Sequence, residues 1–165
     1  GSEMCIRDSS RLQVNQTEVD PSAFVLDMGQ NLAGFAEITV RGKKGQKITL
    51  LVSESLTDEG ACNQRQTGRQ HYYEYTLKGE GVETWHPRFS YYGFRYIQVE
   101  GAVLKGQKNP FRLPVIQKIQ SCFVYNSAPK ISTFECSNRI FNDAHRLIEK
   151  AVRSNMQSVF TDCPH

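Results

Sequence analysis

The hydrophobic residues of this chain change their spacing once, and that change divides the sequence into two parts. From Phe24 to about Asn126, apolar side chains recur at every second position, which is the period of a half-buried β-strand. After Ser137 they recur at intervals of three and four residues as far as Val159, which is the period of an amphipathic helix. The pattern therefore predicts a β domain followed by one helix.

The β part is expected to fold as an antiparallel β-sandwich of the concanavalin-like or jelly-roll kind. Two alternating runs, at 36–40 and 48–52, flank the turn-forming stretch 42–45, and this arrangement predicts a β-hairpin. The polar stretch 57–70 has no periodicity and is expected to be a loop. Further strands are expected at 73–77, 94–99 and 115–125. Short strands separated by turns are typical of two-layer β domains.

The helix is expected to run from Asn138 to about Ser158. Ser137 or Asn138 can cap its first turn, and Glu149 is placed four residues before Arg153 for a favourable ion pair. A single helix cannot bury such an apolar face by itself. We therefore interpret it as the opening of a second domain whose remainder the chain lacks, and the chain as a fragment.

The composition excludes some classes of function. Hydrophobic residues make up 39% and charged residues 22% of 165 residues, as in an ordinary globular protein. The net charge of +3 is small, and the lysines gather in turn-like stretches such as 43–47 and 105–108, so we expect no nucleic-acid partner. No run is long and apolar enough to predict a membrane span.

The first residues fit neither the sandwich nor a targeting signal. Residues 1–10 lack the apolar core of a signal peptide, and the string Met4-Cys5-Ile6-Arg7-Asp8-Ser9 fits no recognisable element. We interpret residues 1–11 as a non-native leader, exclude them from the fold and infer no localisation.

The five cysteines do not predict a metal site, because none of them has a metal-ligand spacing. Cys62, Cys122, Cys136 and Cys163 lie far apart in the sequence, and isolated cysteines of this kind are usually small buried hydrophobes. A disulfide between two of them would need an oxidising compartment, which the sequence does not reveal.

A first polar motif is the stretch Asp27-Met28-Gly29-Gln30-Asn31, followed by Gly34. Its carboxylate and amides could hydrogen-bond a sugar. The same residue types more often satisfy backbone groups within a turn, and we favour that structural role.

A second motif is the aromatic cluster from Trp85 to Tyr96. Aromatic rings stack on sugar faces, so Trp85 and Arg95 are candidate carbohydrate contacts. Aromatic rows of a sandwich more often belong to its core, and Arg88 and Arg95 can stack on these rings or pair with carboxylates such as Glu83. We favour the structural role here as well.

Several stretches occur in a fixed order along the chain. They are Asp27-Met28-Gly29-Gln30-Asn31 with Gly34, Tyr75-Thr76-Leu77-Lys78-Gly79, Glu83-Thr84-Trp85 with Pro87-Arg88-Phe89, Tyr92-Gly93-Phe94-Arg95-Tyr96-Ile97 with Val99, Phe134-Glu135-Cys136-Ser137-Asn138, and Thr161-Asp162-Cys163-Pro164. Together, from about Ala23 to His165, they resemble the motifs of bacterial α-L-rhamnosidases, glycoside hydrolase family seventy-eight.

The resemblance implies a fold, an activity and a division into domains. Residues 12–126 would form a concanavalin-like β-sandwich, residues 127–136 a linker, and residues 137–165 the first helix of an (α/α) six-hairpin glycosidase domain. The activity would be inverting hydrolysis that releases terminal α-L-rhamnose, with no cofactor. Its partners would be rhamnose-containing glycosides or polysaccharides and the missing catalytic barrel of the same chain.

The resemblance also implies where the chemistry lies. The general acid and the base of the family are glutamates that would lie beyond His165, so we expect the fragment alone to be inactive. The carboxylate of the D-C-P motif, Asp162, is expected to bind rhamnose hydroxyls.

Two other interpretations stay open. The chain could be a non-catalytic carbohydrate-binding sandwich that uses the aromatic cluster around Trp85. It could also be a structural sandwich of another six-hairpin glycosidase with a different specificity.

Overall fold

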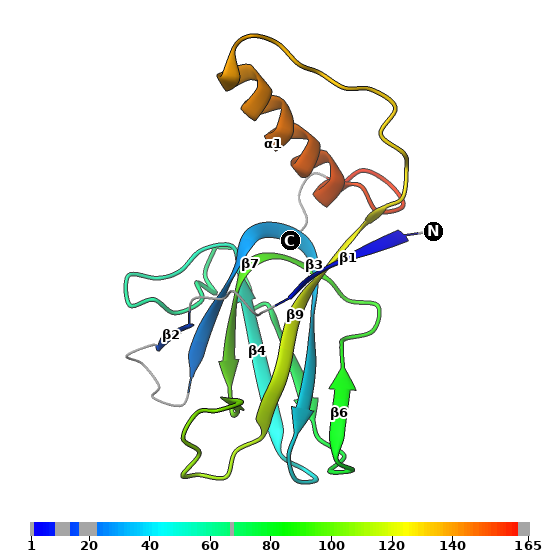
Figure 1. Ribbon diagram of the computed structural model, residues 1–165. Helices are drawn as coiled ribbons and strands as arrows, with labels where there is room; N and C mark the ends of the chain where they lie inside the picture. The colour runs from blue at the N-terminus through cyan, green and yellow to red at the C-terminus, as the bar shows by residue number, and fades with distance from the viewer. Residues whose placement is uncertain (1, 9–13, 17–22, 67, 162–165) are drawn as a thin grey trace.

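The computed structural model describes residues 2–8, 14–16, 23–66 and 68–161, which form a β-sandwich and one helix (Figure 1). The elements are β1 (Ser2–Asp8), β2 (Val14–Gln16), β3 (Phe24–Arg41), β4 (Lys47–Ser53), β5 (Tyr72–Thr76), β6 (Val82–Trp85), β7 (Tyr92–Glu100), β8 (Val103–Leu104), β9 (Val115–Asn126) and α1 (Arg139–Asn155).

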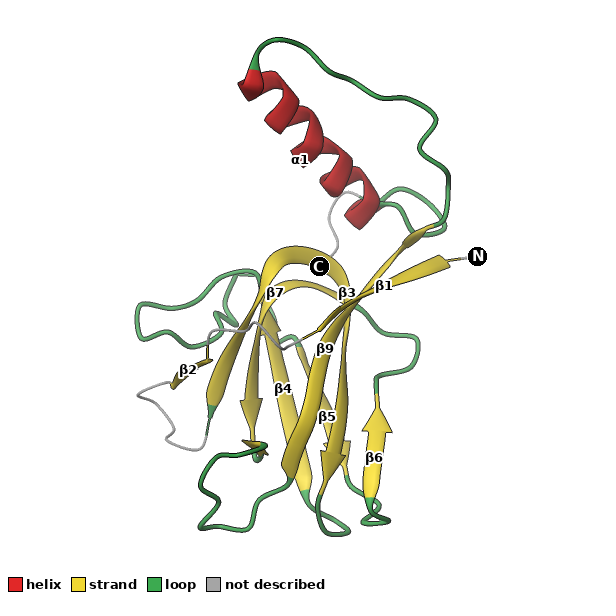
Figure 2. Ribbon diagram, viewed as in Figure 1, coloured by secondary structure: helices red, strands yellow, loops and turns green. Residues whose placement is uncertain are grey.

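Strand β3 takes part in both layers of the sandwich (Figure 2). Its first part pairs with β2 and β7, and the same layer continues from β7 through β4 to β5. Its second part pairs with β9 and β6, and β9 also pairs with β1 and with the short parallel strand β8. All the other pairings are antiparallel, so the predicted antiparallel sandwich is confirmed.

The core lies between the two layers. Alternate side chains of the second part of β3, such as Ile38 and Val40, belong to one buried cluster with Leu50 of β4 and Ile97 of β7. Each of these four side chains is at most 1% exposed. The alternation in the sequence therefore identified the inward face correctly for the runs at 36–40 and 48–52.

The predicted hairpin between 36–40 and 48–52 was wrong. Strands β3 and β4 do not pair with each other, because β7 lies between them in the sheet order. The connection at 42–46 instead bonds to the end of β5, where Gly45 donates to the Leu77 carbonyl and Leu77 donates to that of Gln46. It carries the chain from one layer to the other and so sets the two apolar rows face to face. Alternation specifies the buried face of a strand but not its neighbour.

We expected residues 1–11 to lie outside the fold. This expectation was wrong for the backbone of Ser2–Asp8. These residues form β1, which pairs antiparallel with β9 from Ser2↔Asn126 to Asp8↔Gln120. The free edge of β9 offers unpaired backbone groups, and a strand can satisfy them with its own backbone whatever its side chains are. The pairing does not decide whether residues 1–11 are native, so the leader remains a prediction.

Helix α1 begins as predicted and lies beyond one end of the sandwich (Figure 1). Asn138 caps its first turn through Oδ1, which accepts from the Ile140 N–H at 2.9 Å. The predicted ion pair between Glu149 and Arg153 is not formed in the described structure. Lys130 binds the Glu149 carboxylate at 2.5 Å, and the Arg153 guanidinium lies 5.3 Å from the centre of the Tyr125 ring. Among the described residues, no helix has the length and apolar character needed to cross a membrane.

Gly34 is the residue where β3 passes from one layer to the other. It pairs with Tyr92 of β7 on one side and with Phe123 of β9 on the other. A Cβ atom added at Gly34 would lie 1.9 Å from the carbonyl oxygen of Cys122, a distance that no side chain can occupy. Only glycine permits this close approach of two backbones.

We predict that Gly34→Ala lowers the free energy of unfolding by about 3 kcal/mol or more, because β3 and β9 must move apart. The matched control is Gly45→Ala, where φ is +84° but no atom lies within 4 Å of the added Cβ. This control should cost about 1 kcal/mol, from backbone strain alone. Urea unfolding measures both values. Equal losses for the two variants would show that the close contact at Gly34 does not constrain the sandwich.

Candidate functional site

The polar motif of residues 27–31 is engaged within the sandwich. Asp27 Oδ1 and Oδ2 accept two parallel hydrogen bonds from Arg95 Nε and Nη2, at 2.8 and 2.7 Å, and Asp27 Oδ1 also accepts from the Gly29 N–H at 2.7 Å. Asn31 Nδ2 donates to the Glu54 carboxylate at 2.6 Å. The structural role favoured for this motif is therefore confirmed for Asp27, which satisfies a backbone group at the irregularity of β3 between Asp27 and Leu32.

The electrostatics of this pair follow from its geometry. The hydrogen bonds from Arg95 hold the pKa of the Asp27 carboxyl below its usual range, and partial burial opposes this effect only in part. The side chains of Arg95 and Asp27 are 42% and 28% exposed. The guanidinium also lies 5.2 Å from the centre of the Tyr96 ring. Arg95 therefore pairs with a carboxylate and lies over an aromatic ring, as predicted. Its carboxylate partner is Asp27 and not Glu83.

Glu83 has different partners, all close to it in the sequence. Its carboxylate accepts from the Tyr75 hydroxyl at 2.5 Å and from the backbone N–H groups of Lys78 and Gly79 at 2.9 and 2.8 Å. These bonds hold the pKa of the Glu83 carboxyl below its usual range, with the Tyr75 hydroxyl as the main cause. The carboxylate therefore ties the turn between β5 and β6 to the strands on either side.

Trp85 lies at the end of β6 and is half-buried against the core. Its ring stacks on Tyr75 with the centroids 4.9 Å apart and the planes inclined by 20°. The next residue, His86, stacks on Phe35 in the same way at 5.1 Å. Phe89, in contrast, is fully exposed and has a φ of 59°. Trp85 and Arg95 are thus not joined in one site: each has its own partners within the sandwich.

The prediction of buried, hydrophobic cysteines is confirmed for Cys62 and Cys122 but not for Cys136, and Cys163 lies outside the described residues. Cys62 and Cys122 are buried, and burial raises the pKa of each thiol to about 11, so both are protonated and unreactive at neutral pH. Cys136 is half-buried. Within residues 23–66 and 68–161 no three histidine, cysteine or acidic side chains come together in a way that could hold a metal ion.

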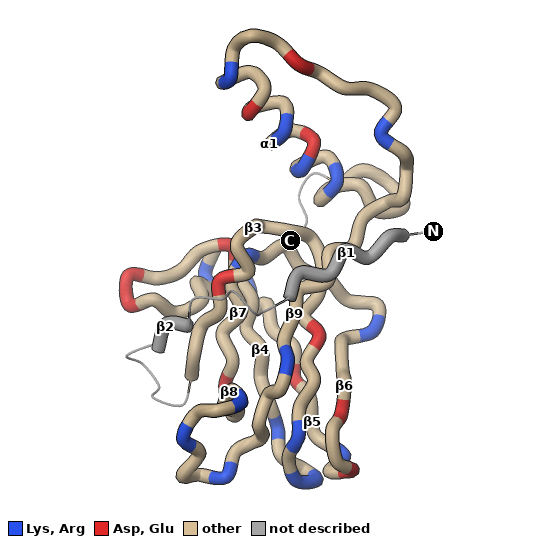
Figure 3. The backbone as a smooth tube through the Cα atoms, viewed as in Figure 1, with Lys and Arg blue, Asp and Glu red and all other residues tan. Residues whose placement is uncertain are grey.

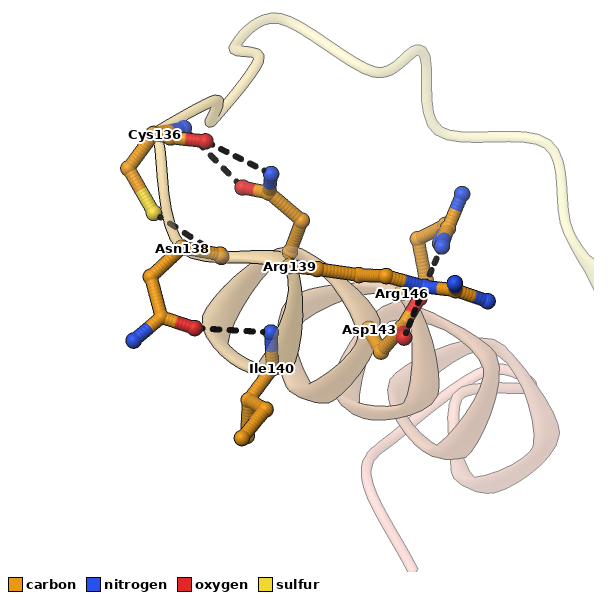
Figure 4. Close-up of polar contacts among 7 residues, drawn as sticks. Cys136, Asn138, Arg139, Ile140, Asp143 and Arg146 are labelled. Carbon is orange, nitrogen blue, oxygen red and sulfur yellow. Dashed lines mark hydrogen bonds and ion pairs between the residues drawn. The ribbon is translucent and has the colours of Figure 1, made fainter.

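The start of α1 is a compact polar arrangement (Figure 4). The side chain of Asn142 reaches back to Cys136, accepting from its N–H at 2.9 Å and donating to its carbonyl at 2.8 Å. Asp143 forms ion pairs with Arg139 and Arg146 on the neighbouring turns. The beginning of the helix is therefore fixed by local contacts that the sequence of residues 136–146 supplies by itself.

The end of α1 is attached to the sandwich through β9. The Asn126 N–H donates to the Met156 carbonyl at 3.0 Å, and Asn126 Nδ2 donates to the Gln157 carbonyl at 2.9 Å. In return Gln157 Nε2 donates to the Val124 carbonyl at 2.8 Å. We call these three hydrogen bonds the junction clamp. The sequence does not predict this contact, because an asparagine at a strand end and a glutamine after a helix carry no signal that they will meet.

The apolar face of α1 is uncovered. No residue of the helix is buried, and five large side chains on it are between 41% and 74% exposed, namely Ile140, Phe141, Leu147, Ile148 and Val152. Charged residues of both signs are interspersed along the helix, together with small and amide side chains (Figure 3). The prediction that this stripe would find no partner within the chain is confirmed for the described residues.

Asp162, the predicted rhamnose-binding carboxylate, lies outside the described residues. Thr161, directly before it, is described. Its N–H and Oγ1 both donate to the Asn155 carbonyl, at 2.8 and 3.1 Å, so the chain turns back onto the last residue of α1.

Two family models match the chain, one after the other. The bacterial alpha-L-rhamnosidase concanavalin-like domain matches residues 17–125, and the bacterial alpha-L-rhamnosidase 6 hairpin glycosidase domain matches residues 129–165. The first match alone covers more than half of the chain. The chain belongs to the bacterial α-L-rhamnosidase family. The two matches meet between the end of β9 and the start of α1.

Curated rhamnosidases align with most of this chain. An α-L-rhamnosidase of Streptomyces avermitilis is 36% identical over 151 residues, which is 90% of this chain and 14% of that protein. An α-L-rhamnosidase of Formosa agariphila is 32% identical over 148 residues, which is 86% of this chain and 15% of that protein. The chain thus spans about 15% of the length of the curated relatives it matches.

Solved rhamnosidase structures share the fold. The α-L-rhamnosidase from Dictyoglumus thermophilum has a TM-score of 0.77 and 29% identity, over 98% of this chain and 17% of that chain. The Streptomyces avermitilis α-L-rhamnosidase complexed with L-rhamnose has a TM-score of 0.76 and 31% identity, over 99% of this chain and 15% of that chain. Because these matches cover nearly all of the rhamnosidase-family chain, they include α1 as well as the sandwich.

The Asp27–Arg95 pair makes a prediction for the stability of this rhamnosidase-family chain. Arg95 lowers the pKa of Asp27 in the folded state, so the stabilisation is present above about pH 4 and is lost as the pH falls below it. Asp27→Asn should lower the free energy of unfolding at pH 7 by about 1 to 2 kcal/mol, since the pair is partly exposed.

Urea unfolding at pH 7 and at pH 3 tests this. The difference between wild type and Asp27→Asn should shrink at pH 3, whereas Asp58→Asn, at an exposed aspartate, should match wild type at both values. A wild-type advantage over Asp27→Asn that is the same at pH 3 and pH 7 would contradict the assignment.

Proposed function

We propose that this chain supplies the concanavalin-like sandwich and the opening helix of the six-hairpin domain of an α-L-rhamnosidase, an inverting glycoside hydrolase that releases terminal α-L-rhamnose. The observation that carries the proposal is the order of the two family matches, which meet between β9 and α1. The domains that we propose are a sandwich at 12–126, a linker at 127–136 and the first helix of the catalytic domain at 137–165.

The proposed substrates are rhamnose-containing glycosides or polysaccharides. In support, the S. avermitilis relative was solved as a complex with L-rhamnose, and it aligns with 99% of this chain. Asp162 is our candidate for a carboxylate that binds the rhamnose hydroxyls. The support for Asp162 is the resemblance of Thr161-Asp162-Cys163-Pro164 to the family motif.

The chemistry would be carried out outside this chain. Inverting hydrolysis needs a carboxylic acid that protonates the leaving oxygen and a carboxylate that activates water, held roughly 6.5 to 9.5 Å apart. The resemblance assigns both groups to glutamates that would follow His165. The sandwich would contribute a rigid support for the catalytic domain, and the uncovered stripe of α1 would pack against the helices of that domain.

We predict that the 165-residue chain alone does not hydrolyse an aryl α-L-rhamnoside above a buffer blank. A chimera in which this chain replaces the matched segment of the S. avermitilis enzyme should hydrolyse it, because the missing acid and base are then supplied. Release of the aryl group measures both. Turnover by the chain alone, or a folded chimera without turnover, would contradict the proposal.

Trp85 and Arg95 are proposed as carbohydrate contacts only in the alternative, non-catalytic function. Their partial exposure permits such a contact, but Trp85 is already stacked on Tyr75 and Arg95 is already paired with Asp27. The main proposal therefore gives both residues a structural role.

The fluorescence of Trp85, the one tryptophan of the chain, distinguishes the two functions. We predict that titration of the chain with L-rhamnose leaves the emission unchanged, because the ring is already stacked on Tyr75. Trp85→Ala should lower the free energy of unfolding by about 2 kcal/mol, less than for a fully buried tryptophan. A saturable change in emission with L-rhamnose would instead favour a binding function of the sandwich.

A further inference from the structure

The position of α1 on the sandwich depends on few contacts. Residues 127–138 connect β9 to α1 without regular structure, and such a segment leaves the helix free to move. Lys130 pairs with Glu149 midway along the helix, but an exposed ion pair of this kind is weak. The Arg153 guanidinium of α1 also lies over the Tyr125 ring of β9. The junction clamp adds direct hydrogen bonds between the strand and the helix end through Asn126 and Gln157.

The segment held by the clamp leads straight to Asp162. Residues 156–161 form a tight return in which Met156 and Phe160 make an isolated β-bridge. Thr161 closes this return through its two hydrogen bonds to the Asn155 carbonyl. Four residues separate Gln157 from Asp162. The described part of this segment ends at Thr161, and it is held by hydrogen bonds at Gln157 and at Thr161.

We infer that Asn126 and Gln157 are positioning residues that fix, relative to the sandwich, the return at 156–161, which directly precedes our candidate sugar-binding residue Asp162. The inference rests on the proposed function, and in particular on the proposed role of Asp162. Neither residue would touch the substrate. Their effect would come through geometry, because a misplacement of about 1 Å in a group that binds the reacting sugar can lower the rate on the order of a hundredfold.

The variant that tests this is Gln157→Glu. Glutamate has nearly the same shape but no N–H to donate, and its charge would face the Val124 carbonyl. The matched control is Gln117→Glu, which makes the same change at an exposed position of β9. In the chimera described above, Gln157→Glu should lower kcat/KM for the aryl rhamnoside about tenfold, and Gln117→Glu should leave it unchanged.

A double-mutant cycle separates positioning from a general structural effect. If Gln157 acts through Asp162, then Gln157→Glu should cost little more in a chimera that already carries Asp162→Asn, within about twofold. If the two substitutions instead lower kcat/KM by independent factors that multiply, the inference is overturned and the proposed function stays intact. A folded, unsubstituted chimera without turnover would instead contradict the proposed function itself.

A second measurement needs only the 165-residue chain. The amide hydrogen of Thr161 should exchange with solvent at least about tenfold faster in Gln157→Glu than in wild type, because the loss of one clamp bond and the repulsion between the new carboxylate and the Val124 carbonyl loosen the return that Thr161 closes. Gln117→Glu should not change this rate. An unchanged rate in Gln157→Glu would overturn the inference, whether or not the chimera folds.

Discussion

The close approach of β3 and β9 at Gly34 is the constraint on which the rest of the structure depends. At this residue β3 has a partner on each side, β7 in one layer and β9 in the other. The backbones can meet there because glycine leaves the Cys122 carbonyl unobstructed. The two layers are therefore joined through a continuous strand as well as through the side chains between them. That junction sets the position of β9, and β9 in turn carries the helix.

The helix end shows how a β domain can hold the beginning of an α domain. Val124 and Asn126 of β9 hydrogen-bond to the residues after α1. The Val124 carbonyl accepts from the Gln157 side chain, and Asn126 donates to the carbonyls of Met156 and Gln157. The apolar stripe of the helix plays no part in this attachment and stays open. A large apolar face of this kind usually marks a surface that another part of the protein covers. The proposed six-hairpin domain would be that part.

The sequence predicted the features of the fold that depend on one element at a time. The period of two found the longer strands β3, β4, β5, β7 and β9 and many of their buried side chains. The period near 3.6 found α1, with Ser137 or Asn138 as its cap, and the structure shows Asn138 in that role. It did not predict that β7 lies between β3 and β4, because alternation says nothing about which strands are neighbours. It also missed β1, whose pairing with β9 depends on the backbone.

The features of the candidate site also divide into those that the sequence predicts and those that it does not. The stretch around Asp27 was recognised as a turn motif, but its partner Arg95 is 68 residues away, and no local pattern links the two. The pair Asn126 and Gln157 is likewise formed by residues distant in sequence. The order of the motifs, in contrast, predicted the rhamnosidase family that the two family matches show. Motifs are a property of the sequence, whereas contacts between distant polar residues are a property of the fold.

The sandwich and α1 form one body, held at the end of β9. Residual dipolar couplings of the backbone amides, measured on the 165-residue chain in a weakly aligning medium, test this. Couplings from the sandwich strands and from α1 should fit a single alignment tensor with the orientations of this structure. Two separate tensors, with smaller couplings in the helix, would show instead that α1 moves independently of the sandwich.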